Sequence, residues 1–163
     1  METLHFTRIN SPVGHLVIGV SEKGLTILEF DRGHLSPKFS WVESRERAAR
    51  YVRQLEEYFA GKRQNFDFPL DLRGTEFQLR CWNALLKIPY GETRTYGEQA
   101  RVIGCPRGFR AVGAANHDNP IAIVVPCHRV IAAGGGLHGY GGGLENKRWL
   151  LELEGAMTPA LAS

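Results

Sequence analysis

The sequence has 163 residues, with 20 Lys and Arg against 17 Asp and Glu, which gives a net charge of +3. This length allows one or two small domains, and the mildly basic balance permits a polyanionic partner without requiring one. The three cysteines are widely spaced and suggest neither a disulfide framework nor a zinc site. No stretch approaches the ~18 apolar residues of a membrane span, and the first residues lack a signal-peptide pattern, so we expect a cytoplasmic protein.

The first part of the chain alternates apolar and polar residues in the manner of strands. Three short segments separated by Gly and Pro predict an antiparallel meander: 4–9, 15–20 and 24–30. Segment 42–61 predicts one amphipathic helix that covers a face of this sheet. Its apolar residues recur at helical spacing: Ala48, Val52, Leu55 and Phe59. Segment 67–74 is typical of a last strand and a linker.

The character of the sequence changes after Gly74, where short helices with clear start signals begin. We therefore predict two domains, residues 1–74 and 75–163. Thr75 and Gln78 form a capping-box pattern that opens a helix over 76–88. The fold class expected from this order is α/β (α+β), a small antiparallel sheet with a helix followed by a mainly helical domain.

A helix-turn-helix is predicted in the second domain. Thr95 and Glu98 repeat the capping-box pattern and open a short helix that ends at Gly104. Pro106 stands where a first helical residue is tolerated and starts a second helix over 107–119. Two short helices joined by a tight turn that contains Gly have the layout of a helix-turn-helix, although many helical bundles contain such pairs.

The second of these helices carries Arg107 and Arg110, followed by a face of small residues: Ala111, Gly113, Ala114 and Ala115. A helix that reads base edges normally presents Asn, Gln, Arg or Lys there. If this helix meets DNA, it binds with little sequence preference. The alternative is that the small residues allow another helix to pack closely, and the sequence leaves both possibilities open.

Segment 121–125 is a continuous apolar run, typical of a buried strand, and Pro126 marks its end. Cys127 therefore lies where the chain leaves this predicted strand. The glycine-rich segment 129–143 predicts a loop that can approach a ligand closely. An amphipathic helix over 144–155 closes the second domain.

Cys127 and His128 are the residue types of an activated sulfur nucleophile. A free thiol has a pKa near ~8.5 and needs help to ionise at neutral pH. Neighbouring side chains of a strand point to opposite faces, so either the backbone turns at Cys127 or a water bridges thiol and imidazole; we favour the water. Three acids of the last helix are candidates to orient the imidazole: Glu145, Glu152 and Glu154. On these residues alone, a structural cysteine beside a surface histidine remains an equal possibility.

Several motifs in order resemble the O6-alkylguanine-DNA alkyltransferase family. They are "IPYGETRTYGEQA", "RAVGAAN", "NPIAIVV", "PCHRVI", "GYGGG" and "KRWLLELE". The similarity runs from about Phe77 to Gly155. It implies a winged-helix-like second domain, and the first part of the chain is compatible with the family's ribonuclease-H-like domain without carrying a diagnostic motif.

The resemblance implies a role for each reacting residue. Cys127 accepts the alkyl group, and His128 takes the thiol proton through a water while Glu154 orients the imidazole. Asn119 ties the helix-turn-helix to the active-site turn. Tyr96 interacts with the guanine and stabilises the departing anion. The implied reaction is direct repair of O6-alkylguanine, and of O4-alkylthymine, in duplex DNA.

The resemblance also implies the DNA contacts. The target nucleotide leaves the stack, and Arg110 occupies the vacated space while the helix lies in the minor groove. The other implied DNA-binding residues are Thr95, Ala111, Gly113 and Ala114. The base pocket is implied to contain Val130, Tyr140, Gly141 and Lys147. We expect a monomer that needs no metal or cofactor and acts once, because S-alkylcysteine has no easy route back to the thiol; cooperative assembly on DNA stays open.

Some positions depart from the family's common pattern, namely Phe109, Gly141 and the pair His117–Asp118. They leave the range of accepted alkyl groups and the details of DNA contact open. Cys81 and Cys105 are interpreted as buried apolar residues. Two rival functions are a damaged-base binding module, which lacks the acceptor cysteine, and a cysteine hydrolase or oxidoreductase, which gives Arg110 no role.

Overall fold

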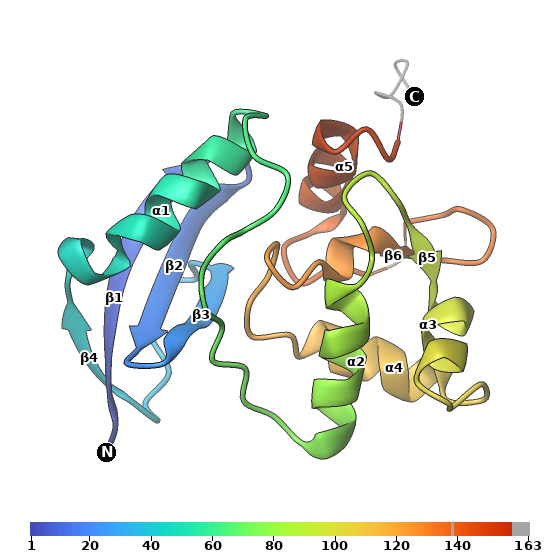
Figure 1. Ribbon diagram of the computed structural model, residues 1–163, viewed down its shortest axis with the longest axis horizontal. Coiled ribbons are helices and arrows are strands. Elements are labelled where there is room, and N and C mark those ends of the chain that lie inside the picture. The colour runs from blue at the N-terminus through green and yellow to red at the C-terminus, as the bar shows by residue number, and fades with distance from the viewer. Residues whose placement is uncertain (138, 158–163) are drawn as a thin grey trace. The chain divides into compact units, whose positions relative to one another are not determined.

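The computed structural model describes residues 1–137 and 139–157 (Figure 1). The chain divides into two compact units. The first unit comprises Met1–Arg73 together with Pro120–Ala122. The second comprises Gly74–Asn119 and the described residues from Ile123 onward. The chain is therefore not divided at a single point, because the short segment Pro120–Ala122 belongs to the first unit.

The first unit is built on a four-stranded sheet of order β3-β2-β1-β4. Its strands are β1 (Thr3–Ser11), β2 (Gly14–Ser21), β3 (Gly24–Phe30) and β4 (Ser40–Glu43). The predicted antiparallel pairing of the first three strands is confirmed. Strand β4, which we did not predict, runs parallel to β1. It has only four residues and none of them is buried, so it lacks the alternation that identifies a strand.

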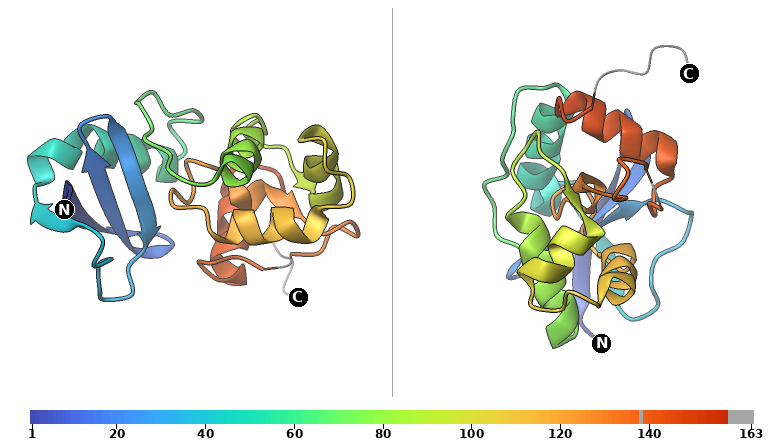
Figure 2. Two further views of the ribbon diagram at one scale, coloured as in Figure 1. Left: turned by 90° about the horizontal axis from the view of Figure 1, so that it is seen from below. Right: turned by 90° about the vertical axis from the view of Figure 1, so that its right-hand side faces the viewer.

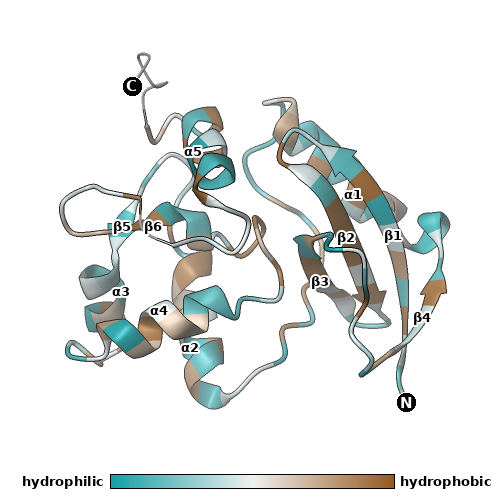
Figure 3. Cartoon of the chain, turned by 180° about the vertical axis from the view of Figure 1, so that it is seen from behind, coloured by the Kyte–Doolittle hydropathy of each residue, from teal (hydrophilic) through white to brown (hydrophobic). Residues whose placement is uncertain are grey.

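Helix α1 (Arg45–Phe59) packs against β1 and β2, as Figures 1 and 2 show. Ser44 begins it by accepting a hydrogen bond from the backbone N–H of Arg47. Its buried side chains include the predicted Ala48, Val52 and Leu55. Tyr58 is buried, whereas Phe59 is only partly buried. Hydrophobic residues dominate β2 and β3 in Figure 3, and together with the buried side chains of α1 they form the core of this unit.

Two short segments cover the outer edge of β3. The backbone N–H of Leu25 donates to the carbonyl of Pro69, and that of Leu28 donates to Pro120. Both contacts are single bridges, so the strands that we predicted over 67–74 and 121–125 are absent. Pro69 has no N–H for a continuing ladder. Ile123 has φ +72, which turns the second segment away from an extended path. For segment 121–125, the apolar composition predicted burial correctly but predicted the wrong backbone conformation.

The second unit begins with three helices, α2 (Glu76–Leu86), α3 (Tyr96–Val102) and α4 (Phe109–His117). Both predicted capping boxes are present, at Thr75 and at Thr95. Helix α4 begins later than we predicted from Pro106, because Gly108 is its N-cap. The buried indole of Trp82 in α2 donates to the carbonyl of Ala115 in α4 at 2.8 Å and fixes these helices together.

The second unit also contains a short parallel pair of strands, β5 (Arg94–Thr95) and β6 (Val130–Ile131), which contacts α3. A single 3-10 turn, η1 (Cys127–Arg129), leads directly into β6. Helix α5 (Leu144–Leu153) follows the glycine-rich loop (Figure 1). Because each strand of the pair has two residues, no periodic pattern in the sequence could reveal it.

None of the helices in the described part of the chain is long and apolar enough to cross a membrane.

Candidate active site

Cys127 lies at the first position of η1, directly after buried Pro126. Its N–H donates to the carbonyl of Val125 at 2.8 Å, and the N–H of Arg129 donates to Pro126 at 3.0 Å. The backbone therefore turns at the cysteine, in place of the strand end that we predicted. Cys127 remains partly exposed, so a substrate can reach it.

Asn119 connects the end of α4 to this turn. Its side-chain amide donates to the carbonyl of Val125 at 2.7 Å and to the sulfur of Cys127 at 3.3 Å. Burial raises the pKa of the Cys127 thiol, while this hydrogen bond and the Lys147 ammonium act in the opposite direction. The two favourable contacts stabilise the thiolate more than the thiol.

His128 and Glu154 form a buried pair in which Nε2 of the imidazole lies 2.8 Å from a carboxylate oxygen. Neither side chain is exposed. Of the three acids considered from the sequence, the structure places Glu154 beside the histidine. Burial lowers the pKa of His128, and the Arg129 and Lys147 cations also lower it, against the raising effect of Glu154. A neutral ring donates from Nε2 and keeps its lone pair on Nδ1, which has no hydrogen-bond partner among the residues described.

Arg129 is a buried site residue that our reading of the sequence missed. Its Nε and one terminal nitrogen donate to the two oxygens of Glu154 at 2.7 and 3.0 Å. The other terminal nitrogen donates to the carbonyl of Ile88 at 2.7 Å. Burial alone would raise the pKa of Glu154, but the hydrogen bonds and charges of His128 and Arg129 lower it to about 2. The only signal in the sequence was a second basic residue directly after Cys127 and His128.

Lys147 of α5 is fully buried, and its ammonium donates to the carbonyls of Val130 and Gly139 at 2.7 and 3.4 Å. Burial lowers its pKa to about 8, although the nearby Cys127 opposes the shift. A positive charge close to the sulfur is therefore available at neutral pH. It weakens as the solution becomes mildly alkaline.

The sulfur faces a cavity of about 200 Å³. The lining residues are Tyr96, Gly113, Asn116, His117, Cys127, Gly139, Tyr140 and Gly141. Burial raises the pKa of Tyr96 and, more strongly, that of Tyr140, and the charge of Cys127 adds to both shifts. Both phenols therefore keep their protons and can donate hydrogen bonds. Val130 and Lys147, which we also predicted for the pocket, are not among its lining residues.

A buried amide pair joins α3 to α4 beside this cavity. Gln99 donates to Asn116 at 2.9 Å, and Asn116 donates back to Gln99 at 2.7 Å. The sequence did not single out either residue. Because each buried amide satisfies the other, the pair fixes how the two helices of the helix-turn-helix meet.

The predicted DNA-binding residues lie on two helices of the second unit. Arg110, Ala111 and Ala114 are exposed on α4, and Gly113 is partly exposed. Thr95 is the N-cap of α3, where its hydroxyl accepts from the N–H of Glu98 at 3.1 Å. Its side chain therefore has a structural task whether or not it meets DNA.

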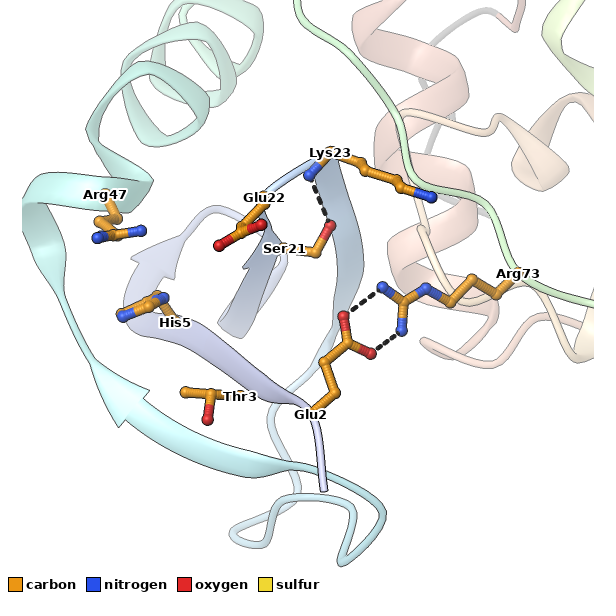
Figure 4. Close-up of a pocket in the computed structure, with 8 residues that line it drawn as sticks. All are labelled: Glu2, Thr3, His5, Ser21, Glu22, Lys23, Arg47 and Arg73. Atoms are coloured by element: carbon orange, nitrogen blue, oxygen red, sulfur yellow. Dashed lines mark hydrogen bonds and ion pairs between the residues drawn. The ribbon is translucent and has the colours of Figure 1, made fainter.

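A second, larger cavity of about 420 Å³ belongs to the first unit (Figure 4). Its lining residues are Glu2, Thr3, His5, Ser21, Glu22, Lys23, Arg47 and Arg73. Arg73 is hydrogen-bonded to both carboxylate oxygens of Glu2 and so occupies one wall. This lining contains charges of both signs and no thiol. Within the described residues, no group of three or more His, Cys, Asp or Glu side chains could hold a metal ion.

Two family models match the chain and between them account for most of it. The 6-O-methylguanine DNA methyltransferase DNA-binding domain matches residues 76–156. The ribonuclease-like domain of the same proteins matches residues 4–72. The chain belongs to the 6-O-methylguanine DNA methyltransferase family. The predicted family and fold class are confirmed.

Relatives in this methyltransferase family are similar over nearly their whole length. A methylated-DNA–protein-cysteine methyltransferase of Methanosarcina acetivorans is 51% identical over 155 residues, which is 94% of this chain and 99% of that protein. The protein of the same name from Mycobacterium tuberculosis is 52% identical over 158 residues, 96% of each chain. A structure of the Mycobacterium tuberculosis protein in complex with DNA superimposes with a TM-score of 0.85 at 51% identity, again covering 96% of each chain.

Proposed function

We propose that this protein repairs duplex DNA by transferring a methyl or other alkyl group from O6 of guanine to Cys127, once per molecule. The observation that supports the proposal most strongly is the environment of the Cys127 sulfur. Cys127 accepts a hydrogen bond from Asn119 at 3.3 Å, opens to a cavity, and is followed by the buried His128–Glu154 pair. O4-alkylthymine, which carries its alkyl group on a similar exocyclic oxygen, is a second substrate of the same site.

In the first step the thiol loses its proton to His128. The side chains are neighbours in η1, but Nδ1 of His128 makes no hydrogen bond to the sulfur or to any other described residue. A bridging water therefore carries the proton from the thiol to Nδ1. Glu154, which stays ionised because its pKa is about 2, stabilises the imidazolium that forms. Arg129 positions Glu154 for this task.

In the second step the sulfur attacks the alkyl carbon in line with the bond to O6. The S–C bond forms as the C–O bond breaks, and guanine leaves with the electron pair. Tyr96 lines the cavity with a phenol that keeps its proton, so it can donate to the departing base. Asn119 and Lys147 stabilise the thiolate before the attack. The acceptor is the protein itself, so this chemistry requires no cofactor, and the thioether product ends the activity.

The target base must leave the stacked duplex to reach the cavity. Arg110 is exposed on α4 and has the length and charge to occupy the vacated space. The small residues Ala111, Gly113 and Ala114 let α4 approach the minor groove closely without reading base edges. Tyr140 and Gly141 line the pocket for the extruded base. In this proposal the protein acts as a monomer, since each step uses residues of one chain.

The test is the transfer of label from duplex DNA that carries a radioactive methyl group on guanine O6. We expect one equivalent of label per protein, on the peptide that contains Cys127. Cys127→Ser is expected to remain unlabelled, while Cys105→Ser, a matched change at a partly exposed cysteine, is labelled like the wild type. Labelled Cys127→Ser protein, or label on another peptide, would refute the proposal.

A further inference from the structure

Phe109 is an aromatic residue that the fold leaves exposed at the beginning of α4. Its exposed fraction is 50%. It is the first residue of the helix and directly precedes Arg110. Within the described residues its ring contacts no other aromatic ring. Single exposed aromatic residues are common on protein surfaces, so exposure alone does not indicate a function. What indicates a function is the position of Phe109 relative to the active-site cavity.

The helical repeat places Phe109 in line with that cavity. At 100° per residue, Phe109, Gly113 and Asn116 lie on one side of α4. Gly113 and Asn116 line the cavity that contains Cys127. A rise of about 1.5 Å per residue puts the backbone of Phe109 about 6 Å along the helix from Gly113. The ring therefore stands roughly one helical turn from the mouth of the cavity.

Arg110 lies on the adjacent, exposed side of the same helix, in a row with Ala114 and with His117, which also lines the cavity. Phe109 and Arg110 thus have large side chains at the start of α4, and the other exposed residues of the helix near them are small. Successive bases of one strand are about 3.4 Å apart. A distance of about 6 Å therefore reaches the base step next to a nucleotide held in the cavity.

We propose that Phe109 is a positioning residue for base extrusion, which inserts its ring as an apolar wedge at the base step beside the nucleotide that enters the cavity. The inference rests on the function proposed above. Proteins that bind the minor groove commonly unstack a base step with an apolar side chain. Arg110 occupies the space that the nucleotide leaves, and Phe109 stacks on the neighbouring base. Stacking on a ring is tolerant of sequence, which suits a protein that must act at any guanine.

The test compares Phe109→Ala and Phe109→Trp with the wild type in single-turnover alkyl transfer. One substrate is duplex DNA containing O6-methylguanine, and the other is free O6-benzylguanine, which needs no extrusion. Stacking of a base on an aromatic ring is lost in this variant, so we expect Phe109→Ala to react about tenfold more slowly with the duplex. With the free base we expect an unchanged rate. Phe109→Trp, which keeps an aromatic face, should retain the duplex rate.

A second readout follows extrusion itself, through the fluorescence of 2-aminopurine placed next to the lesion. Phe109→Ala is expected to lose most of the fluorescence rise that the wild type produces. Val102→Ala is the matched control, because Val102 is an exposed apolar residue of the same unit, 70% accessible, that does not line the cavity. It should behave as the wild type in every assay.

Three results would overturn the inference. Phe109→Ala could react with the duplex at the wild-type rate, or it could lose equal activity on the duplex and the free base, which would mean that the ring supports the cavity. Phe109→Trp could also fail as badly as Phe109→Ala on the duplex. A wild-type protein that takes an alkyl group from neither substrate would instead refute the proposed function, so the two failures are distinguishable.

Discussion

His128 places Nε2 at 2.8 Å from Oε2 of Glu154, and both side chains are completely buried. This contact fixes the tautomer of the ring, because the neutral imidazole donates to the carboxylate from Nε2 and keeps its lone pair on Nδ1. Nδ1 is the atom that the proposed mechanism needs as a base. The pair therefore holds His128 in the form that can accept the proton of the thiol.

The first prediction concerns Glu154→Gln. The pKa of Glu154 falls from 4.5 to about 2 in the folded protein, so its contribution to stability is complete above pH 4.5 and disappears as the pH falls towards 2. A shift of this size corresponds to about 3 kcal/mol, at ~1.36 kcal/mol per pKa unit. We expect Glu154→Gln to unfold at lower urea at pH 7. The difference from the wild type should shrink between pH 4.5 and 2.

The same substitution should slow alkyl transfer, because the imidazolium loses its carboxylate. We expect a loss of about 10- to 100-fold, smaller than the ~10²–10⁴ that a general base itself supplies. DNA affinity should stay close to that of the wild type. Glu145→Gln, the same change at an exposed position of α5, is the control. A Glu154→Gln protein that reacts at the wild-type rate with free O6-benzylguanine would contradict the orienting role.

The second prediction concerns Arg129→Lys, which keeps the charge but loses the planar fork that binds both oxygens of Glu154. Because Arg129 is buried and also donates to Ile88, we expect a stability loss of about 1–3 kcal/mol in urea unfolding. Alkyl transfer should slow less than in Glu154→Gln, since the carboxylate remains. Arg101→Lys, at an exposed position of α3, should be neutral. Equal stability of Arg129→Lys and the wild type would show that the fork is unimportant.

The third prediction uses the pKa of Lys147, which burial lowers to about 8. Below that pH its ammonium stabilises the Cys127 thiolate, and above it the charge is lost. Lys147→Met should therefore reduce the reaction of Cys127 with iodoacetamide at pH 7, roughly tenfold if the thiol pKa rises by one unit. The two proteins should converge as the pH rises past about 8.

Mass spectrometry of the Cys127 peptide measures this reaction separately from Cys81 and Cys105. Lys87→Met, at an exposed position after α2, is the control for the loss of a charge. A constant ratio of rates between the wild type and Lys147→Met from pH 6 to 9.5 would show that Lys147 acts by packing alone.

The parts of the fold that were predictable from the sequence depend on local chemistry. The capping boxes at Thr75 and Thr95 place the starts of α2 and α3 correctly, because a cap involves residues only three positions apart. The two-residue pair β5–β6 and the parallel strand β4 depend on partners distant in the sequence. In segment 121–125, the apolar composition predicts burial but does not predict the backbone conformation, because Ile123 has φ +72 instead of the extended conformation of a strand.

The same difference between local and distant contacts applies to the active site. The resemblance to the family implied roles for Cys127, His128 and Glu154, and the structure places the last two in contact. Arg129 was missed because the resemblance implied no role for it, and its contact with Glu154, 25 residues further along the chain, cannot be read from the local sequence. The choice between a turn and a bridging water was also beyond the sequence. The structure supplies the turn at η1, and Nδ1 of His128 makes no hydrogen bond to the thiol in the part of the chain described.

The last prediction concerns Arg110, which is exposed on α4 beside Phe109. If its side chain occupies the space of the extruded nucleotide, Arg110→Ala should react slowly with duplex DNA and normally with free O6-benzylguanine. Extrusion costs a few kcal/mol, so we expect a loss of about 10- to 100-fold on the duplex. Arg53→Ala, which removes the same charge from an exposed position of α1, should react like the wild type with both substrates.

The dependence of DNA affinity on salt separates this role from a simple phosphate contact. An arginine that only neutralises a phosphate contributes about one unit to the slope of log affinity against log salt, and its removal weakens binding uniformly. An arginine that fills the stack leaves the affinity for undamaged duplex and its salt slope nearly unchanged when it is removed. The rate of alkyl transfer at saturating DNA falls instead. A reduced slope with a normal saturated rate would therefore assign Arg110 to the phosphate backbone and exclude it from base extrusion.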